Sequence, residues 1–315
     1  MSNGPGDTST DTLLGAFKGQ RPPAEPWFTD AIANAPERSR FAVEGAQIEL
    51  LTWGQRGKPG LLFLHGNAAH ADWWSFIAPL FAEDYRCAAI SWSGMGGSDW
   101  REEYRIPLFA GEALSAIEVA CLAESGEPPV IVAHSFGGFP SLYIASEHPE
   151  AIGGAILIDS ASATHGKKGP PPKLVNRSRD HRVYPELAEA LTRFRFMPEQ
   201  ASGDRAIIDW IARGSLKHFE QKEGATGWSW RFDPRFWQKF DRNAIMSDDL
   251  SPKVPLGIIY GADSALFPKG VDQDVIDGYP DCRFVTEIAD AHHHIMADQP
   301  LVLVEEIRKG LEKLR

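Results

Sequence analysis

The sequence contains few cysteines: only Cys87, Cys121 and Cys282 occur among its 315 residues. Because their number is odd and their spacing is wide, they match neither a disulfide framework nor a zinc-binding pattern. We therefore expect each of them to be a small core residue and expect no metal site. Free cysteines of this kind are typical of a reducing, cytoplasmic environment.

Long apolar runs and basic clusters are also missing. No apolar run approaches the roughly 20 residues that cross a bilayer, and the opening MSNGPGDTST does not resemble a secretory signal. The formal net charge of −11 argues against nucleic acid or an anionic membrane surface as a partner, because both attract clustered Lys and Arg. We expect a cytoplasmic protein with a small-molecule partner, and the oligomeric state stays open.

What the sequence does contain is a series of short apolar runs within a composition that is 43% hydrophobic. They predict buried strands at residues 60–66, 86–92, 130–134, 154–160, 255–263 and 282–288. Helix-compatible stretches occur at 109–124, 141–148 and 301–314. Strands that alternate with helices predict an α/β fold with a mostly parallel central sheet flanked by helices.

One interval interrupts this alternation. Residues 161–253 contain no clear strand, and so long a structureless loop would be unusual. We interpret the interval as a helical cap, or lid, inserted into a core made of residues 26–160 and 254–315. Residues 1–25, rich in Gly, Ser, Thr and Pro, are expected to form a poorly ordered arm.

The stretch VIVAHSFGGFP, residues 130–140, places Ser135 between an apolar strand and a helix. A sharp turn at this point would expose the hydroxyl above the sheet, and it requires small residues two positions before and after the serine. Ala133 and Gly137 meet this requirement. The backbone N–H of Phe136, at the helix N-terminus, could stabilise an oxyanion. The alternative interpretation is an ordinary helix-capping serine.

A serine nucleophile needs a base, and the segment DAHHHIMADQP supplies three consecutive histidines. Successive side chains of an extended segment diverge, so one catalytic histidine is more plausible than a metal site. Two aspartates at predicted strand ends, Asp263 and Asp159, could orient the imidazole. Gly261 provides the turn that Asp263 needs, so we prefer Asp263 and keep Asp159 as the alternative.

Four motifs follow one another along the chain: LHGNAAHADWW, VAHSFGG, YGADSALFP and AHHHIMADQP. With these motifs, the sequence from about residue 41 to the end resembles serine-dependent members of the α/β-hydrolase superfamily, which share the order nucleophile, acid, histidine. The resemblance implies His293 as the base, because family members commonly carry the histidine seven residues before a proline, here Pro300. It also implies an oxyanion hole formed by the N–H groups of Asn67 and Phe136, and no cofactor.

The expected activity is hydrolysis of a carboxylic ester through an acyl-enzyme on Ser135. Aromatic residues predict an apolar or aryl substrate, although each of them could instead belong to the core. The candidate pocket residues are His65, Trp73, Trp74, His134, Trp210, Trp228 and Trp230.

Other activities on the same fold stay open: a carbon–carbon hydrolase of meta-cleavage-type diketones, a thioesterase, a lactonase, or a non-catalytic small-molecule receptor. Dehalogenases and epoxide hydrolases of this superfamily carry an aspartate at the nucleophile position. Ser135 argues against both of these chemistries.

Overall fold

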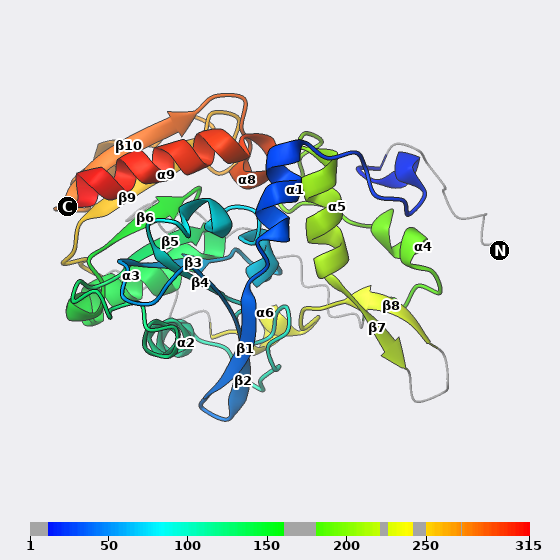
Figure 1. Ribbon diagram of the computed structural model, residues 1–315, viewed down its shortest axis with the longest axis horizontal. Helices are drawn as coiled ribbons and strands as arrows, with labels where there is room; N and C mark the ends of the chain where they lie inside the picture. Colours follow the sequence, from blue (N-terminus) through cyan, green and yellow to red (C-terminus); the bar gives the residue numbers. More distant parts are fainter. Residues whose placement is uncertain (1–11, 161–180, 221–225, 242–249, 272) are drawn as a thin grey trace.

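A computed structural model of the protein describes residues 12–160, 181–220, 226–241, 250–271 and 273–315 (Figure 1). Parts of the predicted arm and of the predicted cap lie outside the described residues. These parts are residues 1–11 of the arm and residues 161–180, 221–225 and 242–249 of the cap.

A sheet of eight strands forms the centre of the described chain, in the order β1-β2-β4-β3-β5-β6-β9-β10. The strands are β1 (Glu37–Val43), β2 (Ala46–Trp53), β3 (Gly60–Leu64), β4 (Arg86–Ile90), β5 (Val130–His134), β6 (Gly154–Ile158), β9 (Leu256–Gly261) and β10 (Cys282–Ile288). Strand β2 is antiparallel to β1 and β4, and the other neighbours are parallel. The predicted mostly parallel sheet is thus confirmed.

Side chains of the central strands alternate between two hydrophobic cores, one on each face of the sheet. In β3, Leu61 and Phe63 belong to one core, and Leu62 and Leu64 belong to the other. Because both faces are covered, strands such as β3 and β6 are apolar at every position, which explains the continuous hydrophobic runs in the sequence.

Helices provide the cover on both faces (Figure 1). Helices α1 (Pro26–Ala33) and α9 (Pro300–Leu314) contribute to the first core, and α2 (Ile106–Val119) and α3 (Gly138–Glu147) contribute to the second. Two shorter helices, α7 (Gln273–Asp277) and α8 (Ile295–Asp298), flank β10 in the chain. Single turns of 3-10 helix lie at Gly15–Phe17, Ala71–Trp73, Ala78–Phe81, Ser135–Gly137 and Pro149–Ala151.

The chain between β6 and β9, which we call the inserted segment, contains both helices and strands in its described part. It contains α4 (Leu187–Leu191), α5 (Arg205–Gly214), β7 (Leu216–Glu220), β8 (Thr226–Trp230) and α6 (Phe236–Lys239). The expectation of an interval without strands is therefore wrong: β7 and β8 form an antiparallel pair, with His218 opposite Trp228. Helix α5 ends at Gly214, a poor helix former, and the alternating TGWSW of β8 suits a strand with one face partly buried.

The described part of the N-terminal arm packs against the inserted segment. Leu14 is buried, and the Arg213 guanidinium in α5 donates a hydrogen bond to the carbonyl oxygen of Gly19 at 2.7 Å. Helix α1 lies beside α5 in Figure 1, with the rings of Phe28 and Trp210 6.3 Å apart. The expectation of a poorly ordered arm is therefore wrong for residues 12–25.

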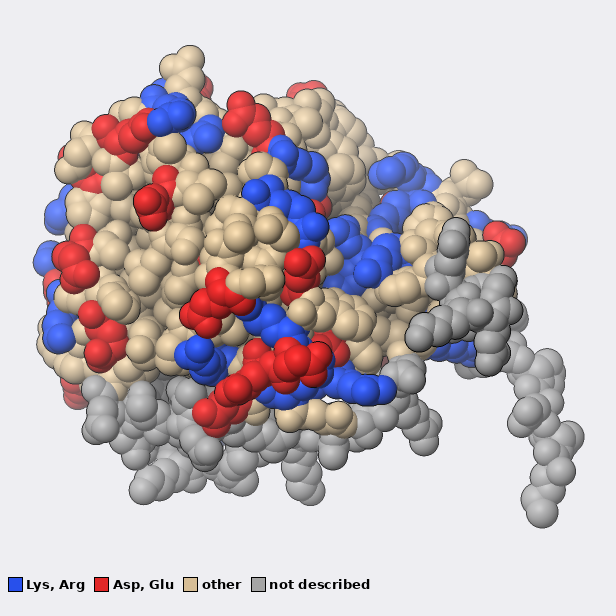
Figure 2. Space-filling model, turned by 90° about the horizontal axis from the view of Figure 1, so that it is seen from below, with Lys and Arg blue, Asp and Glu red and all other residues tan. Residues whose placement is uncertain are grey.

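The surface carries charges of both signs. On the face shown in Figure 2, Lys and Arg side chains lie among Asp and Glu side chains. Several charged side chains of the described residues form ion pairs, such as Arg40 with Asp99 at 2.6 Å and Arg308 with Asp84 at 3.1 Å. Among the described helices, none combines the length and the apolar character needed to span a membrane.

Candidate active site

The register of the sheet brings two predicted site residues to the same height. Strands β5 and β6 are parallel neighbours, and His134 lies opposite Ile158. Ser135 and Asp159 are the next residues along these strands, so both leave the sheet at its carboxyl edge, side by side. In open α/β sheets this edge is where functional residues gather.

The turn that carries Ser135 has the geometry of an exposed nucleophile. Ser135 has a φ of 52°, in the left-handed region that non-glycine residues rarely adopt. A side chain at Gly137 would put its Cβ 2.9 Å from the carbonyl oxygen of Leu64 and 3.0 Å from that of His65, so only glycine fits there. The serine itself is partly exposed, while its neighbours in the turn are buried.

Ser135, His293 and Asp159 form a continuous hydrogen-bonded chain. The distance from Ser135 Oγ to His293 Nε2 is 2.9 Å, and that from His293 Nδ1 to Asp159 Oδ1 is 2.7 Å. His293 is 3% exposed and Asp159 is fully buried. Since a carboxylate only accepts, Nδ1 carries the proton of a neutral imidazole and Nε2 can accept the serine proton. The arrangement meets the geometric requirement for an activated serine.

Three donors satisfy the buried carboxylate of Asp159. Besides His293 Nδ1–H, it accepts hydrogen bonds from the Gly261 backbone N–H at 2.9 Å and from the Ser264 hydroxyl at 2.7 Å. Asp159 also has a positive φ, 42°. Buried charges without partners are costly, so these donors allow a carboxylate to persist at this position.

The structure contradicts our preference for Asp263 as the orienting acid. Asp263 is exposed, and its backbone N–H donates to the carbonyl oxygen of Ala291 at 2.9 Å. The turn that we expected to present Asp263 supports Asp159 instead, through Gly261 and Ser264. Ser264 was not among the predicted site residues, although it lies inside the motif YGADSALFP. Asp159 is the acid because the register of β5 and β6 places it beside Ser135. This register cannot be read from the sequence.

The histidines on either side of His293 are engaged elsewhere. His292 Nδ1 lies 3.2 Å from an Asp298 carboxylate oxygen, and His294 Nδ1 lies 2.8 Å from Gln200 Oε1. Burial lowers the pKa of His294 well below its ordinary value, so this ring is neutral. Among the described residues, no group of three or more potential ligands is placed to hold a metal ion.

Two other predicted pocket residues, His65 and His134, hold backbone segments in place. His65 donates through Nδ1 to the Gly66 carbonyl oxygen at 2.6 Å and accepts at Nε2 from the Trp92 N–H at 3.0 Å. Burial lowers the pKa of His65 to about 3. His134 donates through Nε2 to the carbonyl oxygen of His293 at 2.9 Å, and burial, with His293 nearby, holds its pKa well below the ordinary value.

The predicted oxyanion donors lie in the loops that flank Ser135. Phe136 is the second residue of the turn Ser135–Gly137, so its N–H has no acceptor within that turn. Asn67 follows Gly66, and a Cβ on Gly66 would lie 3.1 Å from the Cβ of Ser135. The loop with Asn67 therefore passes close to the serine, where two N–H groups could converge on one oxygen.

The predicted pocket tryptophans have different surroundings. Trp73 is stacked on His134 at 6.4 Å and lies 5.4 Å from His294, between ring centroids. Trp74 packs on Phe63 in the core at 5.2 Å.

The other three predicted pocket tryptophans belong to the inserted segment. Trp210 donates to the Ser75 hydroxyl at 2.9 Å, and Trp228 and Trp230 belong to β8. Of the five predicted pocket tryptophans, only Trp73 contacts His134 or His294, the neighbours of Ser135 and His293, among the ring contacts of the described residues.

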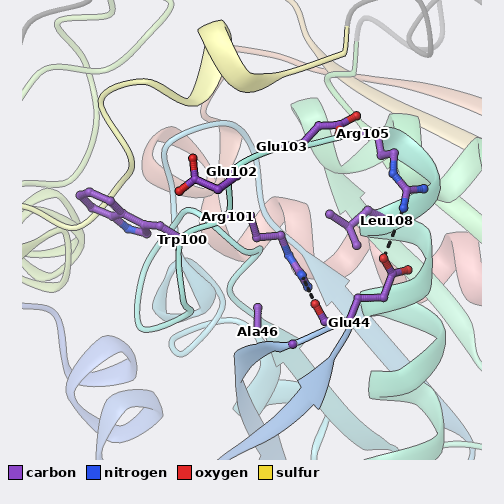
Figure 3. Close-up of a pocket in the computed structure, with 9 residues that line it drawn as sticks. Glu44, Ala46, Trp100, Arg101, Glu102, Glu103, Arg105 and Leu108 are labelled. Carbon is purple, nitrogen blue, oxygen red and sulfur yellow. Dashed lines mark hydrogen bonds and ion pairs between the residues drawn. The ribbon is translucent and has the colours of Figure 1, made fainter.

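A surface depression of about 360 Å³ lies elsewhere, between the β1–β2 hairpin and residues 100–108 (Figure 3). Two of its cations are already bound to Glu44: Arg101 donates to the Glu44 carbonyl oxygen at 2.9 Å, and Arg105 lies 3.3 Å from its carboxylate. Its lining includes none of Ser135, His293 and Asp159. We therefore place the candidate site at the triad.

The chain belongs to the alpha/beta hydrolase family, whose sequence pattern matches residues 61–306. It is 26% identical over 291 residues to Esterase Rv0045c of Mycobacterium tuberculosis, covering 89% of this chain and 91% of the relative. It is 25% identical over 265 residues to the pimeloyl-[acyl-carrier protein] methyl ester esterase of Aromatoleum aromaticum, covering 80% and 99%. It is also similar to Epoxide hydrolase 1 of Caenorhabditis elegans, at 23% over 293 residues, covering 85% and 68%.

Solved structures show the same fold. The thioesterase domain from the curacin biosynthetic pathway has a TM-score of 0.68 at 22% identity, covering 87% of this chain and all of that domain. The crystal structure of Esterase Rv0045c has a TM-score of 0.67 at 20% identity, covering 99% of this chain and 100% of that one. The predicted α/β-hydrolase fold is thereby confirmed, and the related proteins support a hydrolytic activity.

Proposed function

We propose that the protein is a serine hydrolase that cleaves a carboxylic ester of an apolar or aryl small molecule. The observation that carries the proposal is the chain of hydrogen bonds from the partly exposed Ser135 through His293 to Asp159, at 2.9 and 2.7 Å. The similarity to two esterases over most of the chain is consistent with it. A serine rather than an aspartate at this position disfavours epoxide hydrolysis.

In the proposed reaction, Ser135 Oγ attacks the ester carbonyl while His293 Nε2 takes its proton. The tetrahedral oxyanion is stabilised by the N–H groups of Phe136 and Asn67, each worth about 10²–10³ in turnover in comparable sites. His293 then protonates the leaving alcohol, and an acyl-enzyme remains on Ser135. Water, activated by the same imidazole, releases the acid. Asp159 holds the tautomer and stabilises the imidazolium.

The inserted segment acts in this proposal as a cap that helps to form an apolar binding site. Phe196 from this segment stacks on His294 at 4.4 Å and meets Trp73 edge-on at 5.9 Å. Aromatic side chains therefore come from both the core and the inserted segment beside the triad. Such a lining suits an apolar acyl or aryl group.

A panel of p-nitrophenyl esters of increasing acyl length tests the proposal. We expect turnover with an initial burst of p-nitrophenol, because the acyl-enzyme forms before it is hydrolysed. Ser135→Ala should lower kcat by roughly 10⁴-fold or more while the thermal unfolding curve stays close to that of the parent. Retained turnover in Ser135→Ala would refute the assignment of the nucleophile.

The same panel separates the alternatives when it includes an acyl thioester, a lactone and a meta-cleavage-type diketone. Turnover of the diketone without turnover of any ester would identify a carbon–carbon hydrolase. Faster turnover of the thioester or the lactone than of every simple ester would favour those classes. Ligand binding without any turnover would identify a receptor.

A further inference from the structure

The backbone on both sides of His293 is held by side chains. The His292 N–H donates to Asp298 Oδ2 at 2.8 Å, and the His294 N–H donates to Gln200 Oε1 at 3.0 Å. Asp298 belongs to α8, which follows directly in the chain. Gln200 belongs to the inserted segment, more distant in the sequence. The catalytic imidazole therefore sits on a short stretch of chain whose two flanking amides are both fixed.

The inserted segment also contacts Asp298, the first of these two anchors. The Ser202 hydroxyl donates to Asp298 Oδ1 at 2.7 Å, and Gln200 Nε2 donates to Asp298 Oδ2 at 3.3 Å. Two residues further on, the Asp204 N–H donates to the Ala297 carbonyl oxygen at 2.8 Å. Residues 200–204 thus run along the loop and helix that follow His293. Gln200 is 5% exposed, so water does not compete freely for its amide.

Gln200 accepts two hydrogen bonds from one residue. Its Oε1 lies 3.0 Å from the His294 backbone nitrogen and 2.8 Å from His294 Nδ1. The ring of His294 is neutral and is stacked on Phe196 at 4.4 Å, so Nδ1–H is a buried donor. An apolar side chain at position 200 would leave both donors without an acceptor, and the stretch around His293 would shift to satisfy them.

We propose that Gln200 and Ser202 are positioning residues of the inserted segment, which hold His293 in the orientation that reaches both Ser135 and Asp159. The proposal rests on the proposed hydrolase function. The imidazole must bridge two partners at hydrogen-bonding distance on opposite sides of one ring, and a displacement of about 1 Å at a reacting group can cost about 10²-fold in rate. The packing of the inserted segment against α8 is thereby coupled to the placement of His293 as the base.

The test compares Gln200→Met, which keeps the length of the side chain and removes its polar atoms, with Gln238→Met. Gln238 lies exposed on α6 of the same segment and serves as the matched control. We expect Gln200→Met to lower kcat by about 10- to 100-fold, with KM changed no more than about twofold because ground-state binding is retained. The control should keep parent kinetics.

Two further readouts separate positioning from a loss of folded protein. The downfield proton NMR resonance of the His293 Nδ1–H, which is bonded to Asp159, should weaken or disappear in folded Gln200→Met and persist in Gln238→Met. Labelling of Ser135 by a fluorophosphonate probe should slow in parallel with kcat.

A parent-like kcat and resonance in folded Gln200→Met would overturn the proposal. If Gln200→Met does not fold, Ser202→Ala decides. This variant removes one hydroxyl, and we expect a several-fold loss in kcat; unchanged kcat and resonance would overturn the proposal. A parent protein without ester turnover would refute the proposed function, whereas the resonance would still report whether residue 200 positions His293.

Discussion

The carboxylate of Asp159 shows how one residue is suited to its role by its neighbours. It is fully buried, yet it accepts hydrogen bonds from His293, from Ser264 and from the backbone of Gly261. Asp263, two residues beyond Gly261, points into solvent. The two aspartates differ in their access to the imidazole and not in their chemistry.

Replacing each aspartate by asparagine tests this difference. Asp159→Asn should lower kcat by about 10⁴-fold, because the amide N–H can donate to Nδ1 and favour the wrong tautomer, and a neutral amide does not stabilise the imidazolium as a carboxylate does. Asp263→Asn should keep kcat within about twofold of the parent, since an exposed change without buried partners is usually mild. Steady-state kinetics with the best ester of the panel provide the measurement. A larger fall for Asp263→Asn would restore it as the acid.

At the scale of elements, the approach of β3 to the turn after β5 depends on missing side chains. A Cβ at Gly137 would meet two backbone oxygens at 2.9 and 3.0 Å, and backbone cannot rotate away as a side chain can. Gly111, inside α2, is the opposite case: a Cβ there would meet nothing within 4 Å. The two glycines therefore differ in what an added methyl group would do.

We expect Gly137→Ala to lower the free energy of unfolding by about 1–3 kcal/mol, because the overpacked strand end must move. The same shift should displace Ser135 and lower kcat. Gly111→Ala should raise the free energy of unfolding by about 0.5–1 kcal/mol, since alanine favours a helix. Its kcat should stay unchanged. Urea denaturation of the two variants and the parent measures both effects. Equal stability of all three would contradict the close approach seen at Gly137.

At the scale of the whole molecule, burial lowers the pKa of four histidines among the described residues. Burial is the first cause that lowers the pKa of each, and for His65 the value falls to about 3. The other three are His70, His134 and His294. In the unfolded chain a histidine titrates near its ordinary pKa of about 6.5. Below that pH the unfolded state binds protons that the folded state does not, so acid favours unfolding.

The free energy of unfolding should therefore fall as the pH drops from 7 to 5, by up to about 1.4 kcal/mol per pH unit for each fully neutral buried histidine. Urea titrations at several pH values measure the slope. His65→Gln keeps a donor and an acceptor but does not titrate, so its slope should be smaller than that of the parent. A stability independent of pH in this window would contradict the neutral burial of these rings.

Local patterns in the sequence were sufficient for much of the fold and for part of the site. Short apolar runs predicted six of the eight strands of the sheet, since a strand buried on both faces is mostly apolar. The small residues around Ser135 predicted its turn, and the motif order, by resemblance, singled out His293. Each of these features depends on residues that are close together in the chain.

The remaining features depend on segments that are far apart in the chain. The β7–β8 pair lies within the interval that was expected to be a helical cap, and it depends on pairing between two strands that a local pattern does not reveal. Asp159 replaced Asp263 because β5 and β6 lie level in the sheet. Gln200 and Ser202 gained their contacts only when the inserted segment packed against α8. Register and long-range packing are set by the whole folded chain, so the tertiary structure alone decided which polar groups meet at His293.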